Sequence, residues 1–448
     1  LGDLSAPSPF NGGATGRRDL NQYYAIAYAQ DEWHVTPTVN INYGLRYEYY
    51  SVMKEARNLA VIWSPETGQL LPNTTPVFKT NPRNFGPRLS LSWNPAHSRT
   101  TIRLGSGIYY GPGQPEDMIQ PFESDRVSTT LTNSIYPIVP SAVIANYNIN
   151  SATLKFQPRA YDSGYTLPER ILSYTASIQH QLDNNTVLTV AYVGSQGRNL
   201  FMRSWGNAIT GVATNPTTGA AIVTRQFGDR WAEVDVKTSG GRDHYNALQT
   251  TLNRKSRNGL TYGVSYTWGR SIGNSGGSNE TVTVADRTDW SRDYGNNLTD
   301  IRHNLNAVAL YEIKWLRGLQ VGMVINTRTG LPLDPMIVRN DVVYQDRRTG
   351  LYYNSPIVEN GVVQTTAVIN TPGGGQSRQI RRPDYVPGVS PYIQSGGTVF
   401  LNPAAFSTPL PGTFGNAGRY SLHGPSLFQA DLTVQKQWKI KEGIGVQL

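Results

Sequence analysis

The sequence predicts an all-β fold, an antiparallel transmembrane β-barrel, and three observations support this. Segments of about ten residues alternate in polarity, they come in pairs with short connections, and long polar loops separate the pairs. No apolar run reaches the roughly 18 residues that a membrane-spanning helix requires. A transmembrane barrel has short turns on one side and long loops on the other. We therefore expect short periplasmic turns and long extracellular loops.

The first pair shows the pattern most clearly. In residues 39–50, VNINYGLRYEYY, apolar and aromatic residues occupy every second position. A period of two places successive side chains on opposite faces of a strand. Residues 23–35 lead into this strand through only three residues, so the two segments are expected to form an antiparallel hairpin.

The same pattern predicts about a dozen strands in all. The further pairs are 85–93 with 100–110, 171–182 with 186–193, 245–254 with 260–268, 304–311 with 319–326, and a sixth that begins at 428–437. The segments between pairs are 51–84, 111–170, 194–243, 269–301 and 327–426. Loops of that length are uncommon in compact soluble domains but usual on one side of a barrel.

The alternation assigns a facing to individual side chains. The residues expected to face the lumen are Arg46, Glu48, Arg88, Arg103, Gln429 and Asp431. They alternate with residues expected to face lipid, which are Leu45, Tyr47, Leu89, Leu104, Phe428 and Leu432.

Aromatic residues gather at both ends of the expected strands. Tyr23, Tyr24, Tyr49, Tyr50, Tyr109, Tyr110 and Trp268 lie toward the long loops, and Trp33, Trp93, Trp315 and Trp438 lie near short turns. Two such rings are typical of membrane interfaces, although aromatic residues also favour strands in general.

The composition of the 448 residues agrees with a barrel. Charged residues make up 16%, and the chain contains 44 Gly, 26 Tyr and 9 Trp, which does not fit a disordered chain or a coiled coil. There is no Cys, which excludes disulfides and thiolate metal sites. The net charge of +9 is scattered along the chain, which favours loops that face anionic surface lipid, or simple solubility, over an anionic ligand, and we expect no nucleic-acid partner.

Motifs for catalysis, metal binding and cofactor binding are not found. The six His form no HxxxH pair, no GxSxG elbow occurs, and the glycine-rich run 105–111 lies within an expected strand. We expect neither an enzyme nor a metal or cofactor site. Asp300, Arg302 and His303 cluster where a loop enters a strand, and a local ion pair is favoured there over a gating contact.

The long loops contain one group of candidate ligand-binding residues. They are Trp205, Arg225, Trp231, Arg287 and Trp290. Aromatic faces beside charged groups can stack on sugars or other flat ligands. The alternative, which we favour, is that these residues pack the loops against each other.

Several phrases in order along the chain carry a resemblance to a known family. They are QDEWHVTPTVNINYGLRYEYY at 30–50, NFGPRLSLSWNP at 84–95, TIRLGSGIYYG at 101–111, TVLTVAYVGSQGRNL at 186–200, HYNALQTTLNRKSRNGLTYGVSYTWGRSI at 244–272 and DIRHNLNAVALYE at 300–312. Together they resemble the barrel of TonB-dependent outer-membrane receptors, of the Oar-like subgroup with a carboxypeptidase-regulatory-like domain.

The resemblance implies that residues 1–448 are part of a barrel of about 22 strands, a size that holds a plug domain. The plug, a signal peptide and the closing C-terminal strands are not visible in this sequence. The implied location is the bacterial outer membrane, with lipid and lipopolysaccharide as neighbours and the TonB complex as a partner through the plug. The implied function is uptake or binding of a bulky solute, such as a siderophore, an oligosaccharide or a peptide.

Two other functions remain open from the residues alone. One is a passive porin or adhesin-like barrel without energy coupling. The other is a soluble extracellular β-rich protein for binding or surface assembly, in which the alternating faces pack sheet on sheet.

Overall fold

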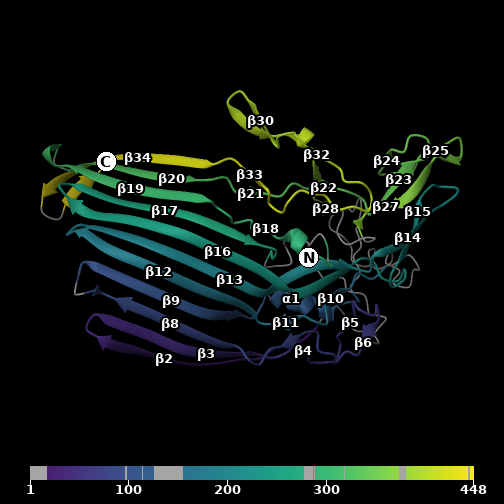
Figure 1. Ribbon diagram of the computed structural model, residues 1–448, viewed down its shortest axis with the longest axis horizontal. Coiled ribbons are helices and arrows are strands. Elements are labelled where there is room, and N and C mark those ends of the chain that lie inside the picture. The colour runs from purple at the N-terminus through teal and green to yellow at the C-terminus, as the bar shows by residue number, and fades with distance from the viewer. Residues whose placement is uncertain are drawn as a thin grey trace.

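One large sheet dominates the structure (Figure 1). The computed structural model describes residues 18–95, 98–113, 115–125, 155–276, 286, 288–316, 318–372, 380–441 and 444–447. Within these residues the sheet has 14 strands. Twelve of them follow one another in chain order: β2 (Tyr24–Thr36), β3 (Val39–Tyr50), β8 (Phe85–Trp93), β9 (Thr100–Gly111), β12 (Glu169–Asp183), β13 (Thr186–Gly206), β16 (Val234–Arg257), β17 (Leu260–Gly273), β19 (His303–Ile313), β20 (Leu319–Arg328), β34 (Leu427–Lys441) and β35 (Ile444–Gln447).

Each of these strands pairs antiparallel with the next. The six predicted hairpins are confirmed as β2–β3, β8–β9, β12–β13, β16–β17, β19–β20 and β34–β35. Their short connections lie at one end of the sheet, and the long segments gather at the other (Figure 1). The predicted all-β fold, one antiparallel sheet built from successive hairpins with short turns at one end and long loops at the other, is therefore confirmed.

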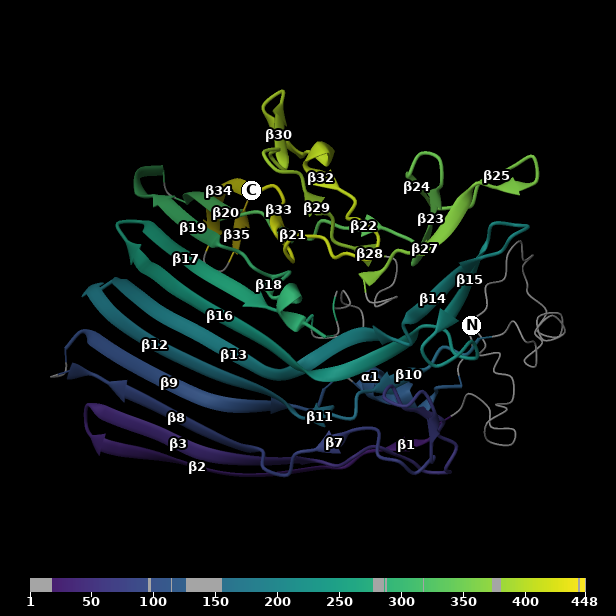
Figure 2. The same cartoon turned by 45° about the vertical axis from the view of Figure 1, so that its right-hand side comes forward.

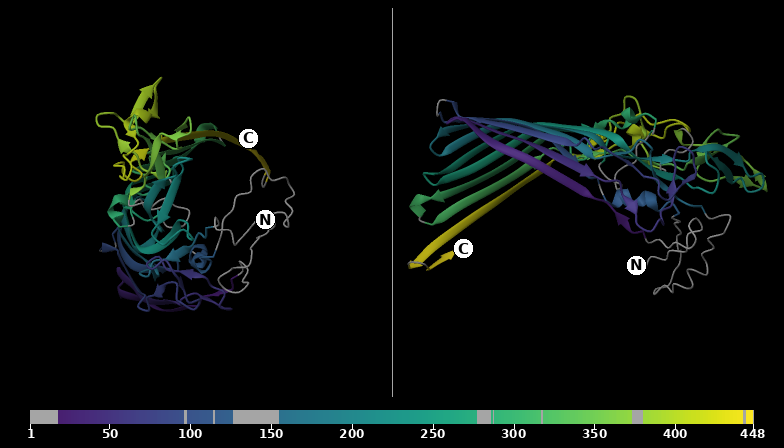
Figure 3. Two further views of the ribbon diagram at one scale, coloured as in Figure 1. Left: turned by 90° about the vertical axis from the view of Figure 1, so that its right-hand side faces the viewer. Right: turned by 90° about the horizontal axis from the view of Figure 1, so that it is seen from below.

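The sheet is strongly curved. Figure 2 and the left panel of Figure 3 show the strands as an arc with a concave and a convex face. β2 and β35 stand at the two ends of the strand order. Strand twist and tilt of this kind close a sheet into a barrel when enough strands are present.

Two strands extend well beyond the lengths that the sequence predicts. β13 and β16 stay paired from Thr186 opposite Arg254 to Gly206 opposite Val234. The register shifts at Arg198/Leu200, where Asn199 has a φ of 58° and its side-chain amide donates to the carbonyls of Thr166 and Pro168 at 2.9 and 3.0 Å. A bulge of this type bends a strand. The prediction that residues 194–243 are a loop was therefore wrong for the residues of this ladder.

The long segments fold into a body with its own core, which we call the loop body. One buried cluster contains Met53, Ala60, Ile62, Val77, Phe78, Met118, Phe122, Tyr161, Tyr165, Leu167 and Phe201. A second contains Trp63, Phe156, Ala160, Trp231, Val234 and Val236. Both clusters include residues of the long extensions of β13 or β16, so these extensions serve as the platform on which the loops pack.

Short elements complete the loop body. The strands are β1 (Leu20–Asn21), β4 (Lys54–Glu55), β5 (Ile62–Trp63), β6 (Leu70–Leu71), β7 (Lys79–Thr80), β10 (Arg159–Tyr161), β11 (Thr166–Leu167), β14 (Ile209–Thr214), β15 (Ala221–Arg225), β18 (Gly295–Asn296), β21 (Pro332–Leu333), β22 (Ile337–Val338), β23 (Val342–Asp346), β24 (Tyr352–Tyr353), β25 (Val358–Glu359), β26 (Val362–Val363), β27 (Thr365–Ile369), β28 (Ile380–Arg381), β29 (Asp384–Tyr385), β30 (Tyr392–Ser395), β31 (Thr398–Leu401), β32 (Phe406–Ser407) and β33 (Leu422–His423). The helical turns of the loop body are α1 (Pro115–Ile119), η2 (Gln120–Phe122), η3 (Trp290–Asp293) and η6 (Pro403–Ala405). A further turn, η4 (Lys314–Leu316), lies in the short connection between β19 and β20. Among the described residues, none of the helices is long and apolar enough to cross a membrane.

Candidate functional site

The concave face of the sheet carries the polar residues that the alternation singled out. Cross-strand register connects them: Arg46 lies opposite Gly86, Arg88 opposite Gly107, and Ser92 opposite Arg103. Continued through β12 to β34, the same face includes Gln429 and Asp431. All six residues predicted to face the lumen thus share one face, and whether that face lines a lumen stays a prediction.

These polar side chains bind one another along the wall. Arg46 Nε lies 2.7 Å from Glu48 Oε1, and the Tyr50 hydroxyl also donates to Glu48. Arg103 donates to Gln179 Oε1 at 2.7 Å, and Gln429 donates to Asp431 Oδ2 at 2.9 Å. The charged side chains therefore bind polar neighbours on the same face of the sheet. The concave face is polar, and these charged groups have hydrogen-bond partners.

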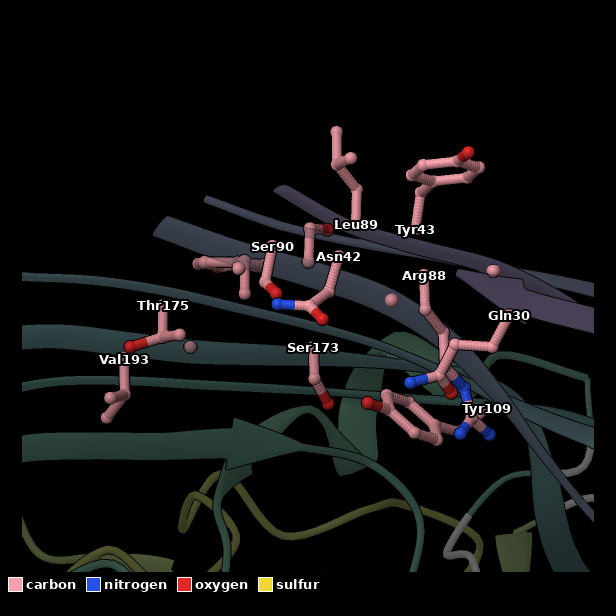
Figure 4. Close-up of a pocket in the computed structure, with 16 residues that line it drawn as sticks. Gln30, Asn42, Tyr43, Arg88, Leu89, Ser90, Tyr109, Ser173, Thr175 and Val193 are labelled. Carbon is pink, nitrogen blue, oxygen red and sulfur yellow. The ribbon is translucent and has the colours of Figure 1, made fainter. Parts of the chain in front are cut away.

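A hollow of about 410 Å³ lies on this face between β2 and β13. Gly44, Gly105 and Gly107 form part of its floor, and Arg88 packs over the Tyr109 ring at 4.6 Å from the ring centroid. Figure 4 shows Arg88, Tyr109, Ser173 and Asn42 pointing to the opposite side of the sheet from Leu89 and Tyr43. A Cβ atom at Gly107 would come within 3.2 Å of Arg88 Cγ. Glycine at this position therefore lets the guanidinium lie close to the wall.

The convex face is apolar. It carries Leu45, Leu89 and Leu104, and Phe428 and Leu432 are each 71% exposed. Tyr47 packs on Phe85 with ring centroids 5.0 Å apart. So much exposed apolar surface on one face of a sheet requires a lipid or protein partner.

Several aromatic residues at the strand ends are exposed, and their place at membrane interfaces stays a prediction. Trp33, Trp93, Trp315 and Trp438 are exposed near the short turns, and Trp268 is exposed at the other end. Two of the expected members behave differently. Tyr50 is buried on the inner side with its hydroxyl on Glu48, and Tyr109 lies under Arg88. For these two, an inward partner for the ring or hydroxyl explains the position better than a membrane interface.

The five candidate ligand-binding residues are not assembled into one exposed site. Trp205 and Trp231 are buried, and Trp231 packs edge-on against Trp63 with centroids 6.1 Å apart. Arg225 is half-buried and donates to the backbone carbonyl of Asn207 at 2.9 Å. Trp290 is half-buried over Gly240, and Arg287 lies outside the described residues. The packing interpretation therefore holds for Trp205 and Trp231, because a buried ring has no face left for a ligand.

Sequence reasoning missed two buried ion pairs, one between β13 and β16 and one between α1 of the loop body and β16. Arg203 binds Asp235 through Nε–Oδ1 and Nη2–Oδ2, both at 2.9 Å. Lys237 is fully buried, with Nζ 3.1 Å from Asp117 Oδ1 and a further bond to Gln120. Burial lowers the pKa of the Lys237 ammonium, and the nearby carboxylates oppose this shift. The only sequence signal is the alternation of charge and valine in residues 234–237, which also suits an ordinary exposed strand.

The cluster at Asp300 is a local structural contact. Asp300 is buried, accepts from Ser271 N at 2.6 Å and lies 3.4 Å from Arg302 Nη2. This geometry fixes the entry into β19 and agrees with the ion-pair interpretation. Among the residues that the structure describes, no group of three or more His, Asp or Glu could hold a metal ion.

Comparison with known proteins adds a family. The family model described as "Outer membrane beta barrel domain" matches residues 4–448. No curated protein matches the chain. Among solved structures, the FrpB iron transporter from Neisseria meningitidis (F3-3 variant) is similar at 11% identity and a TM-score of 0.39, covering 70% of this chain and 34% of that one.

Two further structures are similar at the same level. The siderophore receptor PirA from Acinetobacter baumannii has 16% identity and a TM-score of 0.40, with 69% of this chain and 34% of that chain covered. The outer membrane transporter YddB from Escherichia coli has 11% identity and a TM-score of 0.42, with 80% and 39% covered. The chain thus spans between 34% and 39% of the length of these three structures.

Proposed function

This chain belongs to the outer membrane β-barrel domain family, and from that premise we propose that it forms part of the wall of a TonB-dependent receptor of the Oar-like subgroup. Its location is the bacterial outer membrane. The proposed function is energy-coupled uptake or surface binding of a bulky solute, such as a siderophore, an oligosaccharide or a peptide.

One observation carries this proposal: a single curved wall is apolar outside, polar inside and covered at its long-loop end by a folded body. The outer face suits lipid, and the inner face of paired charges and glycines suits a water-filled or protein-filled interior. A loop body of this size offers a surface for a large solute at the point of entry. The ordered phrases that resemble TonB-dependent receptors support energy coupling over passive flow.

The partners follow from the same proposal. Lipid and lipopolysaccharide are the proposed neighbours of the convex face, and the TonB complex is the proposed partner that acts through a plug domain. Half-buried Arg225 and Trp290, together with Arg287, are the proposed ligand contacts in the loops. No cofactor is invoked.

Uptake by bacteria that carry or lack the complete gene tests this function. Radiolabelled ferric siderophore, maltodextrin and a short peptide serve as probes. We expect accumulation of one probe to require the gene and TonB, and to stop when a protonophore removes the proton-motive force. Accumulation that persists without TonB and with the protonophore would instead establish a passive barrel.

A second measurement addresses the soluble alternative. We expect the complete protein to sediment with outer membranes and to need detergent for extraction. Recovery in the soluble fraction without detergent would show that the convex face packs against protein and not lipid.

A further inference from the structure

A short hairpin stands apart from the loop body. β30 and β31 pair from Tyr392 opposite Leu401 to Ser395 opposite Thr398. The two residues between them, Gly396 and Gly397, have φ angles of 56° and 78°, as a tight type I′ turn requires. Figures 1 and 2 show this hairpin projecting clear of the neighbouring elements. An isolated two-stranded hairpin is only marginally stable in water.

Both faces of the hairpin carry exposed apolar side chains next to the uncharged polar residues Gln394, Ser395 and Thr398. Ile393 and Phe400 are paired on one face, and Val399 and Leu401 lie on the other. All four are exposed, Val399 at 60% and Phe400 at 51%. Side chains of this kind are normally buried, so a contiguous exposed group marks an interaction surface.

The surrounding sequence contains no charge. From position 386 to position 418 there is no Asp, Glu, Lys or Arg. The neighbouring β23–β24 hairpin differs, since Arg348 binds Asp346 and Glu359 at 3.1 and 2.8 Å. An uncharged segment can leave water for an apolar phase without the desolvation cost of an ion. The chemistry of this hairpin therefore fits acyl chains better than a charged protein surface.

The base of the hairpin is tied close to the upper end of β34. The Tyr392 hydroxyl accepts from His423 N at 2.7 Å and donates to His423 O at 3.2 Å. β34 begins at Leu427, and its exposed Phe428 starts a stripe that continues through Leu432 and Val434 and past Lys436 to Trp438. A tilted barrel strand climbs about 2.5 Å per residue, so the ten residues from 428 to 438 span about 25 Å, the height of the apolar band. The hairpin base therefore lies at the outer rim of that band.

The hairpin also lies on the lipid side of the wall. The left panel of Figure 3 looks along the strands from the long-loop end, and the yellow-green hairpin at the top lies outside the arc of the strands. Its exposed side chains thus continue the apolar surface of β34 outward at the level of the rim.

We propose that the β30–β31 hairpin inserts into the outer leaflet of the membrane beside β34 and anchors the segment 331–426 to the lipid surface. The glycine turn at the tip of the hairpin enters the membrane first. The side chains that reach the boundary between headgroups and acyl chains are Ile393, Val399, Phe400 and Leu401. The paired strands satisfy one another's backbone groups within the hairpin, as insertion demands. The bound partner is therefore a lipid surface.

A fluorescent label at the hairpin tests this inference in the complete protein. The described chain has no cysteine, so Phe400→Cys can carry a polarity-sensitive dye. Thr349→Cys, in the exposed turn of the charged β23–β24 hairpin, is the matched control. The protein is reconstituted into vesicles of lipopolysaccharide and phosphatidylethanolamine that contain a lipid-attached quencher.

We expect the dye at position 400 to shift to shorter wavelength and to be quenched by the lipid several-fold more than the dye at position 349. Aqueous iodide should quench in the opposite order. Equal lipid quenching at both positions would overturn the proposal.

Two alternative partners of the hairpin, in place of lipid, would give distinct results and would overturn the proposal. If the rest of the barrel covers the hairpin, the dye at position 400 is shielded from both quenchers. If a second copy covers it, shielding depends on protein density in the vesicle. A Val399→Asp variant, labelled at position 400, should assemble normally and lose the lipid quenching. None of these outcomes depends on whether the barrel transports a solute.

Discussion

The facing of the wall can be tested by placing a charge on its convex side. Leu104 lies on β9, opposite Leu91 on one neighbouring strand and Ala176 on the other. It is four residues above Thr100, the first residue of β9 at the short-turn end. At about 2.5 Å per residue this places Leu104 about 10 Å into a band about 25 Å tall, close to its midplane. Arginine at that depth costs about 2–4 kcal/mol, so Leu104→Arg should lower the free energy of unfolding by that amount.

The adjacent residue provides a matched control. Arg103 points to the concave side, where its guanidinium donates to Gln179 Oε1 at 2.7 Å in an exposed setting. Loss of one such exposed bond is worth about 1 kcal/mol. Arg103→Leu alters the residue next to Leu104 on the same strand and removes a charge. It should therefore have a much smaller effect than Leu104→Arg.

Both variants are measured in the complete protein refolded into phospholipid vesicles. Urea titration followed by tryptophan fluorescence gives the free energy of unfolding, and protease protection reports insertion. We expect Leu104→Arg to insert poorly and Arg103→Leu to insert as the parent does. Equal tolerance of both changes, or greater damage from Arg103→Leu, would refute the assignment of the two faces.

Three further predictions concern the loop body and are measured by protease protection of the loops in the assembled protein. Lys237→Met leaves buried Asp117 without its cation 3.1 Å away, which should destabilise the loop body by about 3–5 kcal/mol, whereas the double variant with Asp117→Asn should recover most of that loss. Asn199→Val should destabilise the bulge because φ is 58° there, and Asn199→Gly, which accepts that φ but loses two side-chain bonds, should be milder; the reverse order would contradict the role given to backbone conformation. The lowered pKa of Lys237 means that the unfolded loops bind more protons between this pKa and the ordinary value of 10.5. The stability of the parent should therefore rise with pH across that window relative to Lys237→Met, and parallel pH profiles would show that the ammonium is not penalised by burial.

The sequence predicts the wall well because one physical rule governs it. Wherever one face meets lipid and the other a polar interior, side chains alternate with a period of two, as in residues 39–50 and 260–268. The rule fails in the extensions of β13 and β16. There Val234, Asp235, Val236 and Lys237 are all buried, because the loops cover one face and the other also packs against protein. Once both faces are covered, polarity no longer reports the direction of a side chain.

The loop residues were harder to interpret for a related reason. Trp205 and Trp231 stand beside charged residues in the sequence, a setting typical of ligand sites and of packed loops alike. Only three-dimensional contacts distinguish the two, such as the 6.1 Å between the Trp231 and Trp63 rings. The inner-wall residues were easier to predict. The alternation along a strand gives the face on which each side chain lies, although it does not give its hydrogen-bond partner.

The buried ion pairs bear on how the loop body can move. Asp117 comes from α1, whereas Lys237 and Asp235 belong to β16 and Arg203 to β13. Separating α1 from β16 would break the buried Lys237–Asp117 pair or expose the whole cluster around Met118 and Phe122 to water. Either route costs several kcal/mol, since breaking one buried pair alone costs about 3–5 kcal/mol. Segments 51–84 and 155–167 pack on the same cluster, so they move with the wall as one unit. Under the proposed function, motion that admits a solute must therefore come from other segments. Among the described residues, those of 331–372 and 380–426, which carry the β30–β31 hairpin, lie outside that cluster.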